Sequence, residues 1–136
     1  MIWKRDTILG VAHNPMVEEV SRGSKQLVRI LVATAPLSYR ETLAFSLQSQ
    51  RPRAEVRIAH PDCLNQEVES FGPHLVVCND TGPEQVRRSV PCWVTIWFHD
   101  SLDATISVTG QDPRLVQDIG TDQLLAIIDE TERLLF

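Results

Sequence analysis

The amino-acid sequence predicts an α/β domain built on a mostly parallel five-stranded sheet with helices on both faces. Two short, almost wholly apolar segments, residues 27–33 and 75–78, are typical of strands that are covered on both sides. Segments with helical spacing of apolar residues lie between the predicted strands, and such alternation of strands with helices is typical of a parallel sheet. The 136 residues are enough for one domain of ordinary size.

The first half of the domain alternates regularly between strands and helices. Pro36 and Pro52 bound the helix that follows the first strand. Residues 54–59 alternate polar and apolar side chains, which predicts a strand nearer the edge of the sheet. Gly72, followed by a proline, is a firm stop for the next helix. The elements predicted in this half are strands at 27–33, 54–59 and 75–78 and helices at 38–50 and 63–71.

The second half departs from this alternation. About two turns of helix are predicted at 84–90, followed by strands at 93–98 and 104–109. Only five residues separate these two strands, whereas the crossover between parallel neighbours needs a dozen or more. The strands should therefore form an antiparallel hairpin at one edge of the sheet. Neither contains a charged residue or a proline, so we expect the outer edge to pair with an arm near residues 8–11 or, preferably, with a second copy of the chain.

An amphipathic helix at 122–135 is predicted to close the domain. It places leucine and isoleucine side chains on one side and mostly acidic side chains on the other. Thr121 suits the position that caps its first turn. Residues 110–120 are left open between a loop and a short helix around 113–117.

Residues 1–26 are predicted to be an extension and not a second domain. Asn14 and Pro15 are typical of a helix start, so a short helix is expected near 15–22. Residues 7–12 before it are either a strand or an irregular arm. The helix carries an apolar stripe that could pack on the core or on another subunit, formed by Met16, Val17 and Val20.

Composition and charge disfavour several classes of protein. The net charge is −5, and residues 100–136 carry eight acidic residues against two basic ones, which disfavours nucleic-acid binding. No apolar run approaches the roughly 20 residues that span a bilayer, and the first residues show no secretory signal. Three cysteines without a CxxC spacing argue against a disulfide framework. We therefore expect a cytoplasmic protein that binds neither nucleic acid nor membrane.

The rim of the predicted sheet, where ligands bind in open α/β folds, carries few charged residues. Ligands bind there at the carboxyl ends of the strands, near the point where the strand order reverses. No glycine-rich phosphate loop follows the first strand, which argues against a nucleotide or flavin site. His99, Asp100 and Ser101 are the residue types of a hydrolytic triad, but sequence neighbours do not face one another as a triad requires. We expect no catalytic residue at this rim, which carries Thr34, Ala35, Asn79, Asp80 and His99.

Two segments of the chain resemble the receiver domain of two-component response regulators. Residues 29–43 are similar to a receiver's first strand and the start of its first helix, and residues 73–79 are similar to its third strand. The resemblance covers roughly residues 27–98. It implies a receiver-like domain over residues 27–136, with a flavodoxin-like three-layer sandwich and a role in signal transduction.

The chemistry of the receiver family does not carry over to this sequence. Thr34 and Ala35 stand where the resemblance implies an acidic pair for magnesium, and Asn79 stands where it implies the phosphoaccepting aspartate. An amide cannot form an acyl phosphate, and a hard divalent cation usually has carboxylates among its oxygen ligands. Asp80 comes one residue later, which on a strand turns the side chain to the opposite face. The sequence therefore resembles a pseudo-receiver, which keeps the scaffold and signals by binding.

Two tryptophans of the predicted hairpin, Trp93 and Trp97, lie on one face of the strand by alternation. They either cover the core under the last helix or form a protein-binding or dimer surface, since tryptophan is enriched in interface hot spots. The sequence also contains two pairs of possible zinc ligands, but one cysteine belongs to a buried apolar run and we expect no metal site. The pairs are His60 with Cys63 and His74 with Cys78.

Two hypotheses from different classes follow from the sequence. The first is a non-catalytic signalling domain that acts by protein–protein interaction, binds no cofactor and forms a homodimer. The second is a small-molecule-binding protein or enzyme that uses the crevice at the carboxyl ends of the strands. The residues that would serve this second function are Thr34, Asn79, Asp80 and His99.

Overall fold

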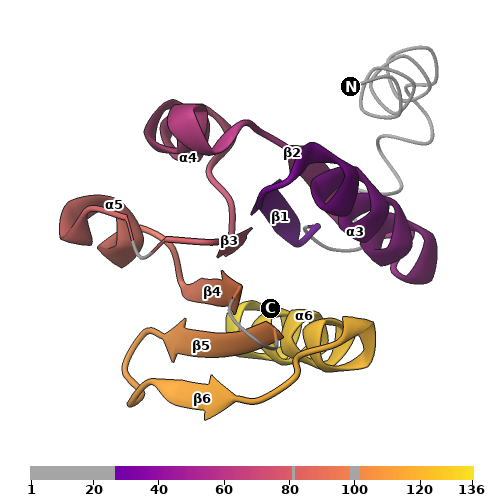
Figure 1. Ribbon diagram of the computed structural model, residues 1–136. Coiled ribbons are helices and arrows are strands. Elements are labelled where there is room, and N and C mark those ends of the chain that lie inside the picture. Colours follow the sequence, from indigo (N-terminus) through magenta and orange to yellow (C-terminus); the bar gives the residue numbers. More distant parts are fainter. Residues whose placement is uncertain (1–26, 81, 99–101) are drawn as a thin grey trace, which may run out of the picture.

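A computed structural model of the chain describes residues 27–80, 82–98 and 102–136 (Figure 1). The extension predicted for residues 1–26, and the triad-like residues 99–101, lie outside these ranges. The strands are β1 (Arg29–Ala33), β2 (Glu55–Ile58), β3 (Leu75–Cys78), β4 (Cys92–Phe98), β5 (Leu102–Val108) and β6 (Arg114–Val116). The helices are α3 (Leu37–Gln50), the 3₁₀-helix η1 (Pro61–Cys63), α4 (Leu64–Phe71), α5 (Glu84–Arg88) and α6 (Thr121–Leu135).

The six strands form one mixed sheet in the order β2-β1-β3-β4-β5-β6. The first four strands are parallel, with β1 between β2 and β3 and with β4 beside β3. β5 runs antiparallel to β4, and β6 runs antiparallel to β5. The α/β class and the antiparallel hairpin predicted from its short connection are therefore confirmed.

The sheet has six strands and not the predicted five. Residues 110–120, left open between a loop and a short helix, contain the edge strand β6. Val116 packs against the core, and Arg114 donates a hydrogen bond of 3.1 Å to Glu130 of α6. β6 covers the outer edge of β5, so the expectation that this edge pairs with an arm or with a second copy is wrong.

Helices cover both faces of the sheet (Figure 1). The chain moves outward from β1 to β2 and then back past β1 to β3 and β4. Because crossovers between parallel strands are right-handed, this reversal places α3 on one face and α4 and α5 on the other. α6 returns to the face that α3 covers, and the two helices share one core cluster.

The central strands are apolar throughout because both of their faces are covered. In β1, Ile30 and Val32 belong to the core under α3 and α6, whereas Leu31 and Ala33 belong to the core under α4. All four side chains are fully buried. β2 alternates half-buried and buried residues and lies at the edge of the sheet, as its sequence predicts.

Two helix ends test the capping predictions. Gly72 follows α4 with a φ of 62°, and its N–H donates a hydrogen bond of 3.0 Å to the carbonyl of Val68, so the predicted stop is confirmed. The prediction that Thr121 caps the last helix is wrong by one residue. Gly120 occupies that position, and its N–H donates a hydrogen bond of 2.8 Å to Oε1 of Gln123. That bond satisfies the N–H of the cap residue, which is the half of a capping box that the third helical residue supplies; a glycine offers no side-chain acceptor to the first turn.

The structure bears on two predictions made from composition. Among the described residues, no helix is both long enough and apolar enough to cross a membrane. The three cysteines are free, with Cys63 exposed and Cys78 and Cys92 buried. A disulfide framework is therefore absent from the described fold, as the cysteine spacing predicts.

Candidate functional site

The carboxyl ends of β1 and β3 lie side by side at the point where the strand order reverses. Thr34 and Ala35 follow β1, and Asn79 and Asp80 follow β3. In open α/β sheets this position is the usual ligand site. The structure brings together four of the five residues predicted for the rim, while His99 lies outside the described residues.

Asn79 ties three strand ends together through its side-chain amide. Its Oδ1 accepts a hydrogen bond of 2.6 Å from the backbone N–H of Ala35, which follows β1. Its Nδ2 donates a hydrogen bond of 3.0 Å to the backbone carbonyl of Ile96 in β4. An ionised carboxylate has no proton to donate, so an aspartate here would leave the carbonyl of Ile96 without its donor near pH 7. Asn79 therefore has a structural role at the rim.

Thr34 is fully buried and offers no side chain to a ligand at the surface. Its carbonyl accepts a hydrogen bond of 2.8 Å from Nε of Arg40 in α3, a residue that is only 7% exposed. Its Oγ1 has no hydrogen-bond partner among the described residues. Ala35 is exposed and carries no polar side chain. The charged group at the end of β1 is therefore a buried cation and not a carboxylate.

Asp80 is exposed and borders a hollow of about 280 Å³ beside α4. Its Oδ1 accepts a hydrogen bond of 3.2 Å from the N–H of Gly82. Its backbone carbonyl accepts hydrogen bonds from the thiol of Cys78 at 2.8 Å and from Nε1 of Trp93 at 3.2 Å. These bonds hold the turn after β3. The polar side chains that line the hollow are those of Asp62, Asn65, Asn79 and Asp80.

The two tryptophans of β4 lie in different environments. Trp93 is 1% exposed and packs in the core cluster under α4. Its interpretation as an exposed interface residue is therefore wrong, and so is its place under the last helix, because α6 covers the opposite face. Trp97 is half-buried, and its Nε1 donates a hydrogen bond of 3.1 Å to Oγ1 of Thr105 across the hairpin.

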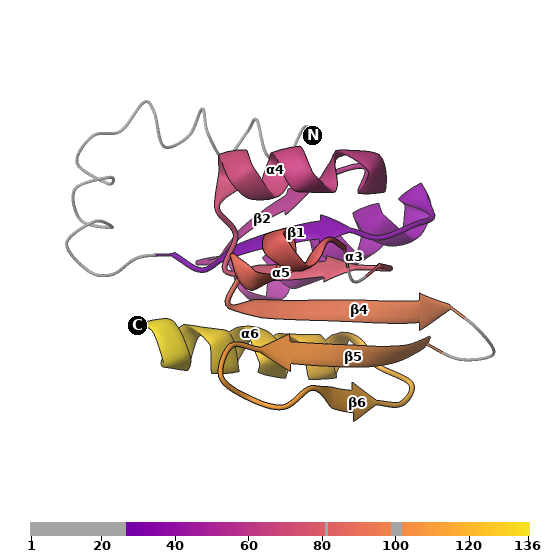
Figure 2. The same ribbon diagram turned by 90° about the vertical axis from the view of Figure 1, so that its left-hand side faces the viewer.

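α4 and α5 lie over the parallel strands on one face of the sheet. On that same face, no described helix covers β5 and β6 (Figure 2). The strand register places Trp97, Asp103, Thr105, Ser107 and Leu115 on this side, and we name these five residues the open face. Leu115 is 68% exposed. Leu115 is absent from the interface residues that the sequence predicts, because no sequence pattern predicts the strand that carries it.

The two buried cysteines are not suited to nucleophilic chemistry. Burial raises the pKa of Cys78 to about 12 and the pKa of Cys92 to about 11. Both thiols therefore stay protonated near pH 7, whereas the thiolate is the form that attacks electrophiles and binds metals. Cys63 is the exposed thiol of the three.

The two histidines considered as zinc ligands accept backbone hydrogen bonds. Nδ1 of His60 accepts the N–H of Asp62 at 3.0 Å and caps η1. Nδ1 of His74 accepts the N–H of Arg29 at 2.9 Å, and burial together with the Arg29 charge lowers the pKa of His74. Among the described residues, no group of three His, Cys, Asp or Glu side chains could hold a metal ion.

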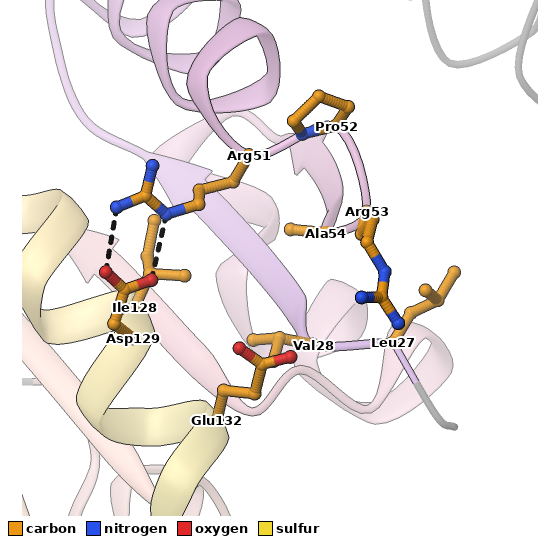
Figure 3. Close-up of a pocket in the computed structure, with 9 residues that line it drawn as sticks. All are labelled: Leu27, Val28, Arg51, Pro52, Arg53, Ala54, Ile128, Asp129 and Glu132. Carbon is orange, nitrogen blue, oxygen red and sulfur yellow. Dashed lines mark hydrogen bonds and ion pairs between the residues drawn. The ribbon is translucent and has the colours of Figure 1, made fainter. Parts of the chain in front are cut away.

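A second hollow, of about 140 Å³, lies at the opposite end of the sheet (Figure 3). Beside it, Arg51 binds Asp129 of α6 through two hydrogen bonds of 2.8 Å. This contact raises the pKa of Arg51 and lowers the pKa of Asp129. No sequence pattern pointed to the pair, because its members lie 78 residues apart. The rest of the lining consists of Leu27, Val28, Pro52, Arg53, Ala54, Ile128 and Glu132.

No protein-family model, no curated protein and no solved structure matches the chain. The likeness of residues 27–98 to receiver domains therefore rests on the segments quoted from the sequence. The fold and the rim define an α/β domain with a mixed sheet, in which an asparagine ties the strand ends at the usual ligand position.

Proposed function

We propose that the chain is a receiver-like domain of flavodoxin-like design that acts by protein–protein interaction and transfers no phosphoryl group. The proposal is supported by the resemblance of residues 27–98 and by the order of the four parallel strands, which reverses beside β1 as in doubly wound sheets. A cytoplasmic signalling role, without a cofactor, belongs to the same proposal.

One observation carries this proposal. Asn79 replaces the aspartate that the resemblance implies, and both ends of its amide are engaged, by Ala35 and by Ile96. An amide in this position cannot accept a phosphoryl group. The rim also lacks the acidic pair at the end of β1, where Thr34 is buried and Ala35 is apolar. A receiver-like scaffold that has neither a phosphoaccepting aspartate nor the carboxylates that hold magnesium favours a role in binding over a role in catalysis.

The phosphoryl part of the proposal is tested with a small phosphodonor. The full chain is incubated with acetyl phosphate and Mg²⁺, and its intact mass is measured. We expect no stoichiometric adduct on the wild type or on Asn79→Asp, which restores the acceptor but not the acidic pair. One phosphate per chain on the wild type, lost in Asp80→Asn, would overturn the proposal.

The open face is the surface that we propose for the protein contact, with a second copy of the chain as partner. It contains a tryptophan, the residue type most enriched in interface hot spots, beside an exposed leucine that no described helix covers. Light scattering at several concentrations should give a mass near that of a dimer. Leu115→Asp should shift the mass toward the monomer, whereas Phe45→Asp should not, although Phe45 on α3 is equally exposed, at 69%. A wild-type monomer at all concentrations would remove the second copy as the partner.

The hollow beside Asp80 favours a second candidate function, the binding of a small polar molecule. It brings the side chains of Asp62, Asn65 and Asp80 to one hollow, where they offer several hydrogen-bonding groups to a small molecule. A thermal-shift screen of nucleotides, flavins and metal ions tests this function. A ligand at 100 times its dissociation constant stabilises a protein by about 2.7 kcal/mol. If no compound shifts the midpoint, this candidate has no support.

A further inference from the structure

Three large apolar side chains are exposed at the amino end of the sheet. Leu27, Leu135 and Phe136, which we name the amino-end patch, are 40%, 38% and 44% exposed. Phe136 packs edge-on against His74, with 5.3 Å between the ring centroids, and His74 accepts the backbone N–H of Arg29 in β1. These contacts place the last turn of α6 at the same end of the sheet as the start of β1 (Figure 2).

The amino-end patch continues into the hollow drawn in Figure 3. Leu27 lines this hollow together with Ile128 of α6, which is 2% exposed and forms an apolar floor. Leu135 lies seven residues after Ile128 and so occupies the same side of the helix. The three exposed apolar side chains therefore lie beside this hollow at one end of the sheet, and exposed apolar side chains that gather in this way mark a contact site.

We propose that residues 1–26 of this chain fold back and cover the amino-end patch. These 26 residues lead directly into Leu27, which is itself part of the patch. Their apolar stripe, Met16, Val17 and Val20, ends seven residues before Leu27. Seven residues of extended chain reach roughly 23 Å, which is enough to return the stripe to the surface beside Leu27.

The charges at the hollow also suit this segment. Arg22 and Lys25 are the basic residues that precede Leu27 most closely in the sequence. Glu132 lines the same hollow and forms no direct ion pair with a described residue. The cations of the hollow are Arg51, which is bound to Asp129 and also feels the charge of Glu132, and Arg53. A basic residue of the segment would add a direct partner for Glu132. Basic residues beside an apolar stripe therefore complement a carboxylate beside an apolar patch.

The covalent tether favours the chain's own segment over a second copy. A short linker holds its two ends at an effective concentration in the millimolar range, well above ordinary protein concentrations. The proposal concerns the opposite end of the sheet from the rim and does not depend on the proposed function. The docking of residues 1–26 and the protein contact at the open face can therefore fail independently, because the open face and the amino-end patch share no residue.

Hydrogen exchange of backbone amides in the full chain tests the proposal. The amides of residues 16–22 should exchange at least about tenfold more slowly than those of an unstructured peptide, at every protein concentration. Leu135→Ser and Phe136→Ser should remove most of this protection. Phe45→Ser, which changes an exposed aromatic side chain on α3 outside both the patch and the open face, should leave the protection unchanged and serves as the matched control.

A charge exchange distinguishes docking from a general loss of stability. Glu132→Lys should lower the protection of residues 16–22 roughly two- to fivefold, the range of an exposed ion pair. Adding Arg22→Glu and Lys25→Glu to that variant should restore the protection of residues 16–22. A variant that had only lost stability would not regain protection in this way. The proposal is overturned if these amides are unprotected in the wild type, or if the charge exchange recovers nothing. Protection that rises with protein concentration would also overturn it and would assign the patch to a second copy.

Discussion

Asn79 accepts a hydrogen bond of 2.6 Å from the backbone N–H of Ala35 and so joins the ends of two neighbouring parallel strands. The same amide donates to the carbonyl of Ile96 in the next strand. The first bond uses the oxygen of the amide and the second uses its nitrogen, so the two neighbours together fix the orientation of the amide. Asn79, the residue that carries the proposed loss of phosphoryl acceptance, is therefore also a structural link across three strands.

Replacing Asn79 with aspartate should destabilise the fold. The carboxylate can still accept from Ala35, but it faces the carbonyl of Ile96 without a proton to donate. We expect the free energy of unfolding to fall by about 0.5–1.5 kcal/mol at pH 7, the range for one lost hydrogen bond, because Asn79 is half-buried. Urea denaturation measures the change. Asp80→Asn, one residue later and exposed, should alter stability by less than about 0.5 kcal/mol.

The pH dependence of Asn79→Asp has a defined sign. A carboxyl group that faces a carbonyl oxygen is favoured in its protonated form, so the pKa of the new aspartate should be higher in the folded state than in the unfolded state. The deficit relative to wild type should therefore shrink as the pH falls through that folded-state pKa. A deficit that is constant from pH 7 to pH 4 would contradict this explanation.

The three cysteines should differ in reactivity. Burial raises the pKa of Cys78 to about 12 and that of Cys92 to about 11, while Cys63 is exposed. A thiol reagent at pH 8 should therefore titrate one thiol per native chain and three per chain in denaturant. Cys63→Ser should reduce the native count to zero. A second thiol that reacts rapidly in the native protein would contradict the burial of Cys78 and Cys92.

The two tryptophans of β4 offer a matched pair of substitutions. Trp93 is buried and its indole N–H donates to the carbonyl of Asp80, whereas Trp97 is half-buried and bonds a threonine. We expect Trp93→Phe to lower the free energy of unfolding by about 2 kcal/mol, through lost packing and a lost hydrogen bond. Trp97→Phe should cost less than about 1 kcal/mol. Chemical denaturation measures the loss of unfolding free energy in each variant. Equal losses in the two variants would contradict the difference in burial.

The sequence predicts those parts of the fold that depend on short-range patterns. β1 and β3 were predictable because strands covered on both faces are apolar throughout, and the hairpin because five residues cannot form a crossover. β6 was not predictable. Its three residues are held by Val116 in the core and by the bond from Arg114 to Glu130, which are contacts between distant parts of the chain.

The candidate site shows the same division. Topology alone brings Thr34 and Asn79 together, because both follow parallel strands that are neighbours in the sheet. The role of Asn79 needs the carbonyl of Ile96, whose position depends on the register of β4. Strand alternation places Trp93 and Trp97 on one face, but it does not say how far the covering helices extend along the strand.

Arg51 and Asp129 join the end of α3 to α6, and their contact should make stability depend on pH in acid. The hydrogen bond from Arg51 lowers the pKa of Asp129 in the folded state below its unfolded value of about 3.9. A carboxyl group shifted in this direction contributes stability above the unfolded pKa and loses it as the pH falls through the folded one. The contribution is therefore complete at pH 5–7 and is lost as the pH falls through the lowered folded-state pKa of Asp129.

We expect Asp129→Asn to lower the free energy of unfolding by about 0.2–1 kcal/mol at pH 7, because both side chains are about one-third exposed and solvent weakens the pair. Arg51→Lys should cost nearly as much, since an ammonium group cannot form the two parallel bonds of the guanidinium. Urea denaturation of wild type and variants between pH 2.5 and 7 measures these differences. Asp112→Asn, an exposed carboxylate with no bond to a described residue, is the control and should show no pH-dependent difference. If the gap between wild type and Asp129→Asn is the same at pH 7 and at pH 2.5, the ion pair does not stabilise the contact between α3 and α6.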